Sequence, residues 1–352
     1  MKFAIVSGGT GGHIYPGIAI AEEIKRRYPQ AEILFLGSED GLEKDLISRA
    51  GYAIELIRAR ALLRTLSYKA ISAPFISMIG YFQARSILKR FFPQALISTG
   101  GYVSLPAVLA AKTCSIPIYI HEQNVLPGFT NRLFRKWAKK VFLSFEASAQ
   151  FMQGTVVGNP VRREIIVLDR EKARANLGVA NHEMAVTVIG GSQGSRRINE
   201  VMVSALSLIG QNHLKILHVV GTRDIALVDK WLGNRKYPFY QRIGYVYNMA
   251  EALAASDLVI SRAGATAIAE FLARGIPMVL VPFPFSAEGH QELNAKVVAE
   301  AGAGIIIKDA DLTAHKIISV LERKHLDLNK MRINCSKLAR PNAAEDIVNA
   351  IV

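Results

Sequence analysis

The sequence has few of the residues that mark disulfide-bonded, zinc-binding or membrane-spanning proteins. Its two cysteines, Cys114 and Cys335, are far apart in 352 residues, which excludes a disulfide framework and favours a reducing compartment. The longest uncharged run, 91–111, is interrupted by prolines and glycines and does not predict a bilayer-spanning helix. The apolar stretch at 3–6 is too short for a signal peptide. We therefore expect a soluble or peripheral protein.

Acidic residues are also scarce compared with basic ones. There are 29 Asp and Glu against 43 Lys and Arg, a formal net charge of +14. A basic surface favours an anionic partner, which could be a nucleic acid, a membrane surface or a phosphorylated substrate. The chain has no aromatic-rich basic motif of the RNA-binding type, so we expect no nucleic-acid partner. A non-catalytic protein that binds polyanions is the alternative from a different functional class.

Motifs for common cofactors and metals are missing as well. The dinucleotide pattern G-x-G-x-x-G fails because Ile14 stands where its last glycine is required. No glycine-rich loop continues into the Lys-Ser/Thr of a Walker A motif, and no H-E-x-x-H or C-x-x-C pattern occurs. The "DAD" at 309–311 resembles the metal-binding motif of some sugar transferases, but its position after a short apolar run predicts a turn. We expect no metal and no cofactor.

Short apolar runs alternate with longer amphipathic segments along the chain. The runs expected to form strands are 2–6, 32–37, 53–57, 95–99, 116–120 and 140–144, then 184–189, 215–221, 257–261, 277–283 and 303–308. Strands that alternate with helices predict an α/β protein with parallel sheets. The pattern restarts after 156–164, which predicts two α/β domains, 1–160 and 161–339. Two such sheets facing each other would form a cleft between the domains. A terminal helix within about 340–352 is expected to pack back on the first domain.

Three glycine-containing turns follow predicted strands: "GGTGG" at 8–12, "STGG" at 98–101 and "GGSQG" at 190–194. A glycine turn before a helix presents unpaired N–H groups to an anion, usually a phosphate. His13 stands beside the first of these turns. A neutral imidazole there could accept a proton from an attacking hydroxyl, but it could equally cap the helix or donate to a phosphate.

Further polar side chains follow other predicted strands. His121, Glu122 and Asn124 are expected together in one short loop, and Arg162 at the domain boundary could clamp a diphosphate or face solvent. In the second half, Glu270 could accept hydrogen bonds from a ribose diol, although a lone carboxylate is more often solvated surface. His290, Gln291 and Asn294 are expected on a loop that leads into a helix, and amide side chains suit sugar hydroxyls.

The segment 69–92 combines bulky apolar residues with Lys69, Arg85, Lys89 and Arg90. Such a composition suits a helix that lies in an anionic bilayer surface. An ordinary core helix with a basic outer face would carry the same residues. The net charge of the chain favours the membrane surface.

Seven motifs together resemble one family, the MurG family of bacterial glycosyltransferases within glycosyltransferase family 28. They are "GGTGGHIYPG" (8–17), "STGGY" (98–102), "HEQNVLPGFTNR" (121–132), "VGNPVR" (157–162), "GGSQGSRRIN" (190–199), "SRAGATAIAE" (261–270) and "HQELNA" (290–295). Their order and spacing match the family over essentially the whole chain. The resemblance implies the GT-B fold, in which two Rossmann-like domains face each other across a cleft. It also implies an inverting, metal-free transfer of N-acetylglucosamine (GlcNAc) from UDP-GlcNAc.

The resemblance also implies the acceptor, the product and the place of the reaction. The acceptor would be the C4 hydroxyl of the N-acetylmuramyl residue in lipid I, undecaprenyl-diphosphoryl-muramyl-pentapeptide, and the β-1,4-linked product would be lipid II of peptidoglycan synthesis. The enzyme would be peripheral on the cytoplasmic face of the inner membrane and would meet other cell-wall synthesis proteins. A UDP-GlcNAc 2-epimerase or a diacylglycerol glycosyltransferase, which share the two-domain layout, is the alternative.

Residue roles follow from the resemblance position by position. Catalysis would fall to His13 or, as second choice, to Glu122. The acceptor side would comprise Gly9, His13, Gly100, Gly101, Tyr102 and Asn131. The donor side would comprise Thr10, Gly11, Gly12, Asn124, Arg162, Ser192, Gln193, Val246, Ala265, Thr266, Glu270, His290 and Gln291. Glu270 would hold the ribose, the Val246 backbone the uracil, and Ser192 with Thr266 the diphosphate. Leu105, Ala267 and His290 depart from residues frequent in the family.

Overall fold

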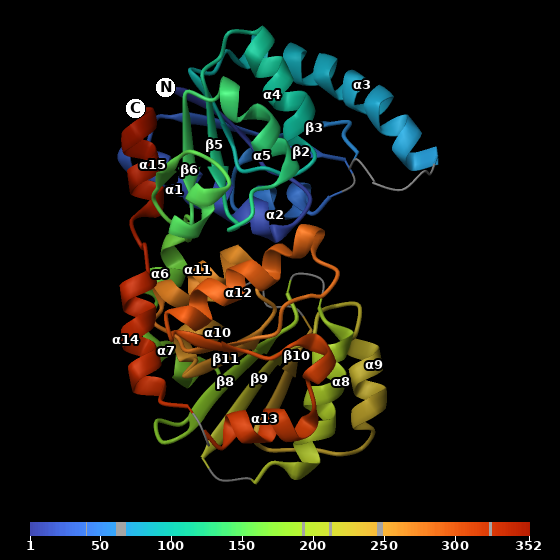
Figure 1. Ribbon diagram of the computed structural model, residues 1–352, viewed down its shortest axis with the longest axis vertical. Helices are drawn as coiled ribbons and strands as arrows, with labels where there is room; N and C mark the ends of the chain where they lie inside the picture. The colour runs from blue at the N-terminus through green and yellow to red at the C-terminus, as the bar shows by residue number, and fades with distance from the viewer. Residues whose placement is uncertain (40, 61–67, 192–193, 211–212, 245–248, 324–325) are drawn as a thin grey trace. The chain divides into compact units, whose positions relative to one another are not determined.

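The computed structural model describes residues 1–352 except 40, 61–67, 192–193, 211–212, 245–248 and 324–325, and for 68–74 it describes the backbone alone. The chain divides into two compact units (Figure 1). Unit 1 comprises Met1–Arg162 and Arg340–Val352, and unit 2 comprises Arg163–Ala339. Each unit is built around a parallel sheet with helices on its faces. The predicted α/β class with two parallel sheets is confirmed.

Unit 1 contains a seven-stranded sheet in the order β3-β2-β1-β4-β5-β6-β7. Its strands are β1 (Lys2–Val6), β2 (Glu32–Ser38), β3 (Ala53–Ile57), β4 (Ala95–Ser98), β5 (Ile118–Glu122), β6 (Lys140–Leu143) and β7 (Thr155–Val156). Its helices are α1 (Gly11–Arg27), α2 (Glu43–Arg49), α3 (Tyr68–Phe91), α4 (Ser104–Thr113), α5 (Phe129–Phe134) and α15 (Ala343–Ile351), with 3-10 turns at Arg135–Trp137 and Glu146–Gln150. The strand order changes direction between β1 and β4, and ligands of open parallel sheets bind at such a point, beyond the carboxyl ends of the strands.

Unit 2 contains a six-stranded parallel sheet in the order β10-β9-β8-β11-β12-β13. Its strands are β8 (Met184–Ile189), β9 (Leu214–Val219), β10 (Tyr240–Ile243), β11 (Leu258–Ser261), β12 (Met278–Leu280) and β13 (Gly304–Ile306). Its helices are α6 (Arg163–Val167), α7 (Arg170–Asn176), α8 (Arg196–Ala205), α9 (Ile225–Leu232), α10 (Met249–Ala255), α11 (Ala265–Ala273), α12 (His290–Glu300), α13 (Ala314–Leu321) and α14 (Leu328–Leu338). Short 3-10 turns occur at Leu206–Leu208, Ala287–Gly289 and Asp309–Asp311. Here the order changes direction between β8 and β11.

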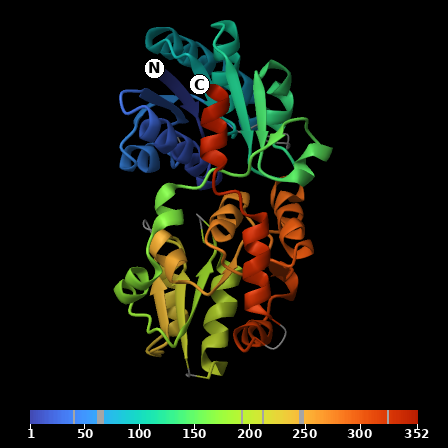
Figure 2. The ribbon, with the colours of Figure 1, turned by 90° about the vertical axis from the view of Figure 1, so that its left-hand side faces the viewer.

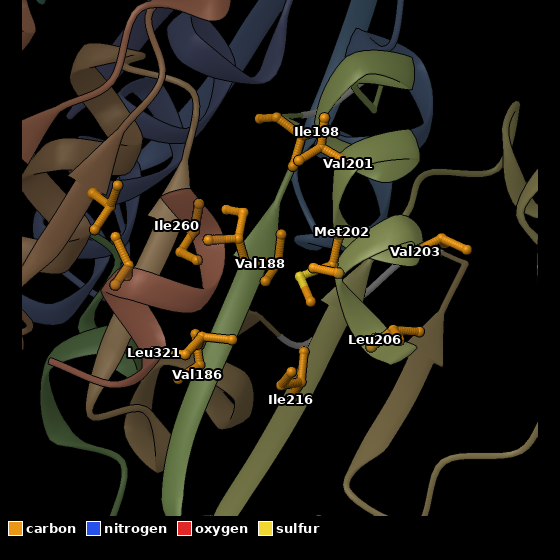
Figure 3. Close-up of a cluster of buried hydrophobic side chains, with 14 of the residues drawn as sticks. Val186, Val188, Ile198, Val201, Met202, Val203, Leu206, Ile216, Ile260 and Leu321 are labelled. Atoms are coloured by element: carbon orange, nitrogen blue, oxygen red, sulfur yellow. The ribbon is translucent and has the colours of Figure 1, made fainter. Parts of the chain in front are cut away.

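The core of unit 2 shows why its strands read as nearly continuous apolar runs. Val186 and Val188 of β8 pack against Ile198 and Met202 of α8 and against Ile260 of β11 (Figure 3). All five side chains are at most 1% exposed. A parallel sheet covered by helices on both faces buries both sets of alternating side chains, so its strands lose the alternation of polar and apolar residues.

The terminal helix α15 belongs to unit 1 although it follows all of unit 2 in the chain (Figure 2). Ile347 and Val348 are buried in the same apolar cluster as Ile20 and Ile24 of α1. An ion pair between Arg27 and Glu345, 2.8 Å long, lies at the edge of this contact. The chain therefore crosses between the units twice.

Several elements differ from the sequence expectations. Strand β5 extends through Glu122, so the expectation that His121 and Glu122 lie in a loop is wrong. Helix α12 begins at His290, so His290, Gln291 and Asn294 are helical rather than in a loop. Strands β7 and β10 were not predicted, because β7 has two residues and β10, "YQRI", is only partly buried and partly polar. The "DAD" segment forms a 3-10 turn, in which Asp309 pairs with Arg262 at 2.6 Å.

Helix α3 packs on α4 (Figure 1). It also carries exposed apolar side chains. Ala84 and Leu88 are fully buried against the unit 1 core, whereas Phe75, Met78 and Phe82 are 74%, 57% and 61% exposed. The exposed residues of α3 are thus apolar at Phe75, Met78 and Phe82 and basic at Lys89 and Arg90. Among the described helices, none combines the length and the apolar character that a bilayer crossing requires.

Candidate functional site

His13 is the third residue of α1 and lies where the loops after β1, β4 and β5 meet. Its Nδ1 atom is 2.8 Å from the Thr99 carbonyl oxygen and 3.0 Å from the Gln123 side-chain oxygen. Gly100 has φ +91°, and a Cβ added there would lie 3.3 Å from the imidazole of His13 and from Asn131. The structure therefore gathers His13, Gly100 and Asn131, which the sequence predicted for the acceptor side.

The remaining acceptor-side residues are joined by a buried carboxylate that the sequence analysis missed. Glu43, at the start of α2, is fully buried and accepts hydrogen bonds from the Gly9 N–H and the Ser38 hydroxyl, both at 2.8 Å. The Ser38 hydroxyl lies 2.7 Å from the Tyr102 hydroxyl. Nothing in the local sequence distinguishes Glu43 from a solvated helix residue, because the contact with Gly9 joins positions 34 residues apart.

The close approach of two loops explains the glycine at position 101. Gly101 has φ +87°, and a Cβ there would lie 2.3 Å from the Gly8 carbonyl oxygen. Only glycine allows this backbone conformation and this distance without strain. The "GGTGG" and "STGG" loops therefore pack directly on each other.

Glu122 lies at the end of β5, 1% exposed, and its carboxylate is fully engaged within the protein. One oxygen accepts from the backbone N–H and the side-chain amide of Asn124, at 2.9 and 3.3 Å. The other accepts from the Gly128 N–H at 2.9 Å and the Asn131 amide at 2.8 Å. A carboxylate has about four acceptor positions, and all four are used here. This geometry favours His13 over Glu122 as the general base.

The unit 1 residues expected to touch the donor have different surroundings. Thr10 and Gly12 are exposed at the first turn of α1, whereas Gly11 is buried. Asn124 donates two hydrogen bonds to Glu122, as described above. Its backbone carbonyl oxygen accepts a hydrogen bond from the Ser148 hydroxyl. Arg162 is only 7% exposed, and its guanidinium carbon lies 4.1 Å from the centre of the Tyr15 ring. Arg162 does not simply face solvent.

In unit 2 the loop after β8 ends at Ser195, which caps α8 by accepting from the Ile198 N–H. Ser192, Gln193 and Val246 lie outside the described residues. The capping Ser195 is held by Arg262, whose guanidinium donates to the Ser195 hydroxyl at 2.7 Å and to Asp309 at 2.6 Å. Arg262 also donates to the Val281 carbonyl oxygen at 3.1 Å, so it joins the ends of β11 and β12 to the start of α8. The sequence analysis missed Arg262.

The other donor-side residues lie at the starts of α11 and α12. Ala265, Thr266 and Glu270 of α11 are 4%, 6% and 7% exposed. The Gln291 side-chain oxygen accepts from the backbone N–H groups of Ala263 and Phe283, at 3.2 and 2.9 Å. Gln291 thus links the loops after β11 and β12 through its side-chain oxygen.

Three residues depart from those frequent in the family suggested by the sequence. His290 begins α12, and its Nδ1 lies 2.7 Å from the Ala287 carbonyl oxygen, which leaves Nε2 as the other polar atom of the ring. Ala267 is the third residue of α11. Leu105 packs against the core of unit 1 from α4. None of the three disturbs the hydrogen bonds described above.

Residues 3–143 match the glycosyltransferase family 28 N-terminal domain, and residues 185–350 match its C-terminal domain. Two curated relatives are named UDP-N-acetylglucosamine–N-acetylmuramyl-(pentapeptide) pyrophosphoryl-undecaprenol N-acetylglucosamine transferase. The relative from Moorella thermoacetica is 40% identical over 365 residues, and that from Halothermothrix orenii is 39% identical over 366. Each alignment covers 100% of this chain and 98% of the relative.

A solved structure agrees with these relatives. The crystal structure of Acinetobacter baumannii MurG superposes with a TM-score of 0.75 at 27% sequence identity, covering 99% of this chain and 98% of that one. The GT-B fold expected from the sequence is thereby confirmed.

Proposed function

The chain belongs to glycosyltransferase family 28, and from this we propose that it transfers GlcNAc from UDP-GlcNAc to lipid I. The bond formed would be the β-1,4 link to the C4 hydroxyl of the N-acetylmuramyl residue, giving lipid II for peptidoglycan synthesis. Full-length likeness to two transferases of this name supports the reaction. The observation that carries it is the imidazole of His13, held by Thr99 and Gln123 beside the glycine loops of unit 1.

We place the acceptor on unit 1. The backbone N–H groups at the start of α1 and in the 98–102 turn suit a diphosphate, because helix N-termini and glycine turns attract anions. Asn131 and Tyr102 border the same loops and would contact the acceptor. The carboxylate of Glu122 orders Asn131 and the 123–128 loop rather than reacting itself.

We place the uridine diphosphate and sugar of the donor on unit 2. Glu270 would accept hydrogen bonds from the ribose hydroxyls, and Thr266 near the start of α11 would donate to the diphosphate. The amino group of Gln291, whose oxygen is already occupied, would donate to a sugar hydroxyl. Ser192 and Val246 complete the proposal from the sequence alone.

The proposed reaction is an in-line displacement at C1 of the donor sugar. The C4 oxygen attacks C1 of the sugar in line, and UDP leaves from the opposite face, which inverts the configuration. The leaving diphosphate gains negative charge, and the N–H groups at helix N-termini with nearby hydroxyls stabilise it. His13 accepts the hydroxyl proton, a contribution that is typically about 10²–10⁴-fold in rate.

One assay tests this proposal. Purified protein is mixed with labelled UDP-GlcNAc and a short-chain lipid I analogue in the presence of EDTA, and lipid-linked label is counted. We expect metal-independent product that requires the lipid. Label found in N-acetylmannosamine without acceptor would instead indicate the epimerase. Bound UDP-GlcNAc without any product would overturn the proposed acceptor and keep the donor.

We also propose that α3 attaches the enzyme to the cytoplasmic face of the bacterial inner membrane. Phe75, Met78 and Phe82 form an exposed apolar surface on α3, and Lys89 and Arg90 lie exposed in its last turn. Apolar side chains that enter the acyl boundary and cations that meet anionic headgroups bind a bilayer surface together. Such a position suits an enzyme whose acceptor is anchored in the membrane by its undecaprenyl chain.

Changing both exposed phenylalanines tests this attachment. The double variant Phe75→Ser, Phe82→Ser should sediment with vesicles containing anionic phosphatidylglycerol at least about tenfold more weakly, because each buried phenyl ring contributes about 1.5–3 kcal/mol. Phe285→Ser, which removes a ring 84% exposed in unit 2, is the matched control and should bind like the unchanged protein. Equal sedimentation of the double variant would refute the role of α3.

A further inference from the structure

Gln123, directly after β5, is the buried residue that connects His13 to the interior of unit 1. Its side chain is 2% exposed. Its nitrogen Nε2 lies 2.8 Å from the Thr99 carbonyl oxygen and 3.2 Å from the His121 carbonyl oxygen. Its oxygen Oε1 lies 3.0 Å from His13 Nδ1. Gln123 does not itself react in the proposed mechanism.

The surroundings fix which end of this amide points to His13. Two carbonyl oxygens can only accept hydrogen bonds, so the end of Gln123 that faces them must be its amino group. Turning the amide over would place its oxygen against both carbonyls in a buried site, at the full penalty of unpaired polar groups. The oxygen of Gln123 therefore faces the imidazole.

The proton on His13 is fixed by the same reasoning. Both groups around Nδ1, the Thr99 carbonyl at 2.8 Å and the Gln123 oxygen at 3.0 Å, are acceptors. Nδ1 must then carry the hydrogen, and in the neutral ring Nε2 keeps its lone pair. The hydrogen bonds at one nitrogen thus leave the other nitrogen able to accept a proton.

His121 supports this arrangement from the far side of Gln123. Its Nδ1 lies 3.0 Å from the Gln123 amino group, and its Nε2 lies 3.0 Å from the Gly158 carbonyl oxygen. Nδ1 therefore accepts and Nε2–H donates, which describes a neutral ring. Burial lowers the pKa of His121 to about 4, with a smaller contribution from the charge of His13, so the ring stays neutral near pH 7. A proton on Nδ1 would oppose the amino group of Gln123.

We propose that Gln123 is a positioning residue that holds His13 in the Nδ1–H tautomer, with Nε2 presented as the base. The inference rests on the proposed function for its catalytic meaning, but the tautomer itself is a property of the unliganded protein. In the reaction the C4 oxygen–hydrogen bond breaks as the C4 oxygen–C1 bond forms and the bond from C1 to UDP breaks. The proton moves to Nε2, and the resulting imidazolium keeps Nδ1–H bonded to both acceptors, which a positive charge strengthens.

The tautomer can be measured without substrate. Protein labelled with ¹⁵N in its histidines is studied by long-range ¹H–¹⁵N correlation at pH 8, and the His13 signals are assigned as those lost in His13→Gln. We expect the pattern of a ring protonated at Nδ1. Gln123→Met keeps the side-chain length but removes both polar ends. The Thr99 carbonyl still accepts at Nδ1 in this variant, so we expect a larger share of the Nε2–H form rather than complete loss of the Nδ1–H form. Ser148→Ala removes a nearby buried hydroxyl that does not touch His13, and should leave the pattern unchanged.

The steady-state kinetics of the Gln123→Met variant provide a second test. Gln123→Met should lower kcat about 10-fold or more while the KM for UDP-GlcNAc stays within about twofold, since the tautomer matters for proton transfer. An Nε2–H pattern in the unchanged protein, or a ratio of the two tautomers that does not change with Gln123→Met, would overturn the inference whether or not the protein transfers GlcNAc. The Nδ1–H tautomer of His13 could also be found in a protein that shows no transferase activity. That result would support the inference about Gln123 and contradict the proposed function.

Discussion

His13→Ala is expected to lower kcat for GlcNAc transfer about 10²–10⁴-fold, the usual share of a general base. The KM for UDP-GlcNAc should change by no more than about twofold. The reason is that the ring is held by Thr99 and Gln123, beside the loops proposed for the acceptor, and not by the unit 2 residues proposed for the donor. Steady-state rates with both substrates varied, and calorimetric titration of UDP, separate the two effects.

An exposed histidine provides the control for this change. His315→Ala removes an imidazole on α13 of unit 2 and should leave both constants unaltered. An unchanged kcat in His13→Ala would reject His13 as the base. A large rise in KM for UDP-GlcNAc with kcat preserved would move His13 to donor binding.

Glu122→Ala is expected to destabilise unit 1 rather than to remove a reacting group. The change leaves four N–H groups without this acceptor, those of Asn124 (two), Gly128 and Asn131. The bond from Asn131 is buried, and the other three are partly buried. Each loss of this kind is typically about 1–3 kcal/mol, partly recovered by water, so a total of about 3 kcal/mol is expected. For a unit of this size that lowers Tm by roughly 6–12 °C, which scanning calorimetry measures.

The control for Glu122 is a carboxylate whose ion pair is exposed. Glu146 pairs with Arg340 at 3.0 Å, but its side chain is 80% exposed, and such surface pairs contribute about 0–1 kcal/mol. Glu146→Ala should therefore leave Tm nearly unchanged. If Glu122→Ala kept its Tm and lost its activity, the carboxylate would act in the reaction, and Glu122 would replace His13 as the leading candidate for the base.

Most strands were predictable from the sequence because a strand buried on both faces of its sheet appears as a nearly continuous apolar run. Runs such as 2–6 and 184–189 match β1 and β8 residue for residue. The glycine loops were predictable for a related reason, since positive φ at Gly100 and Gly101 excludes nearly every other residue. Strand β10 escaped prediction because it is only partly buried and partly polar.

The polar partners within the candidate site could not be predicted, because their role depends on contacts across the fold. Glu43 bonds to Gly9, 34 positions earlier, and His13 contacts Gln123 110 positions later. In the sequence Arg262 cannot be distinguished from a surface cation. Its role becomes evident only in the fold, where it contacts Ser195 and Asp309. The apolar and basic composition of α3 was evident from the sequence, but only the packing of Ala84 and Leu88 decides which face of the helix is buried.

The return of α15 to unit 1 sets the order in which the two halves can be completed during translation. Unit 2 is one uninterrupted segment, 163–339, and all of its residues are synthesised before the last helix of unit 1. Until Ile347 and Val348 arrive, their neighbours on α1 leave apolar surface uncovered. A growing chain with such a surface is prone to aggregate or to be held by chaperones. The second half of the chain can therefore be finished first, and the first half is finished last.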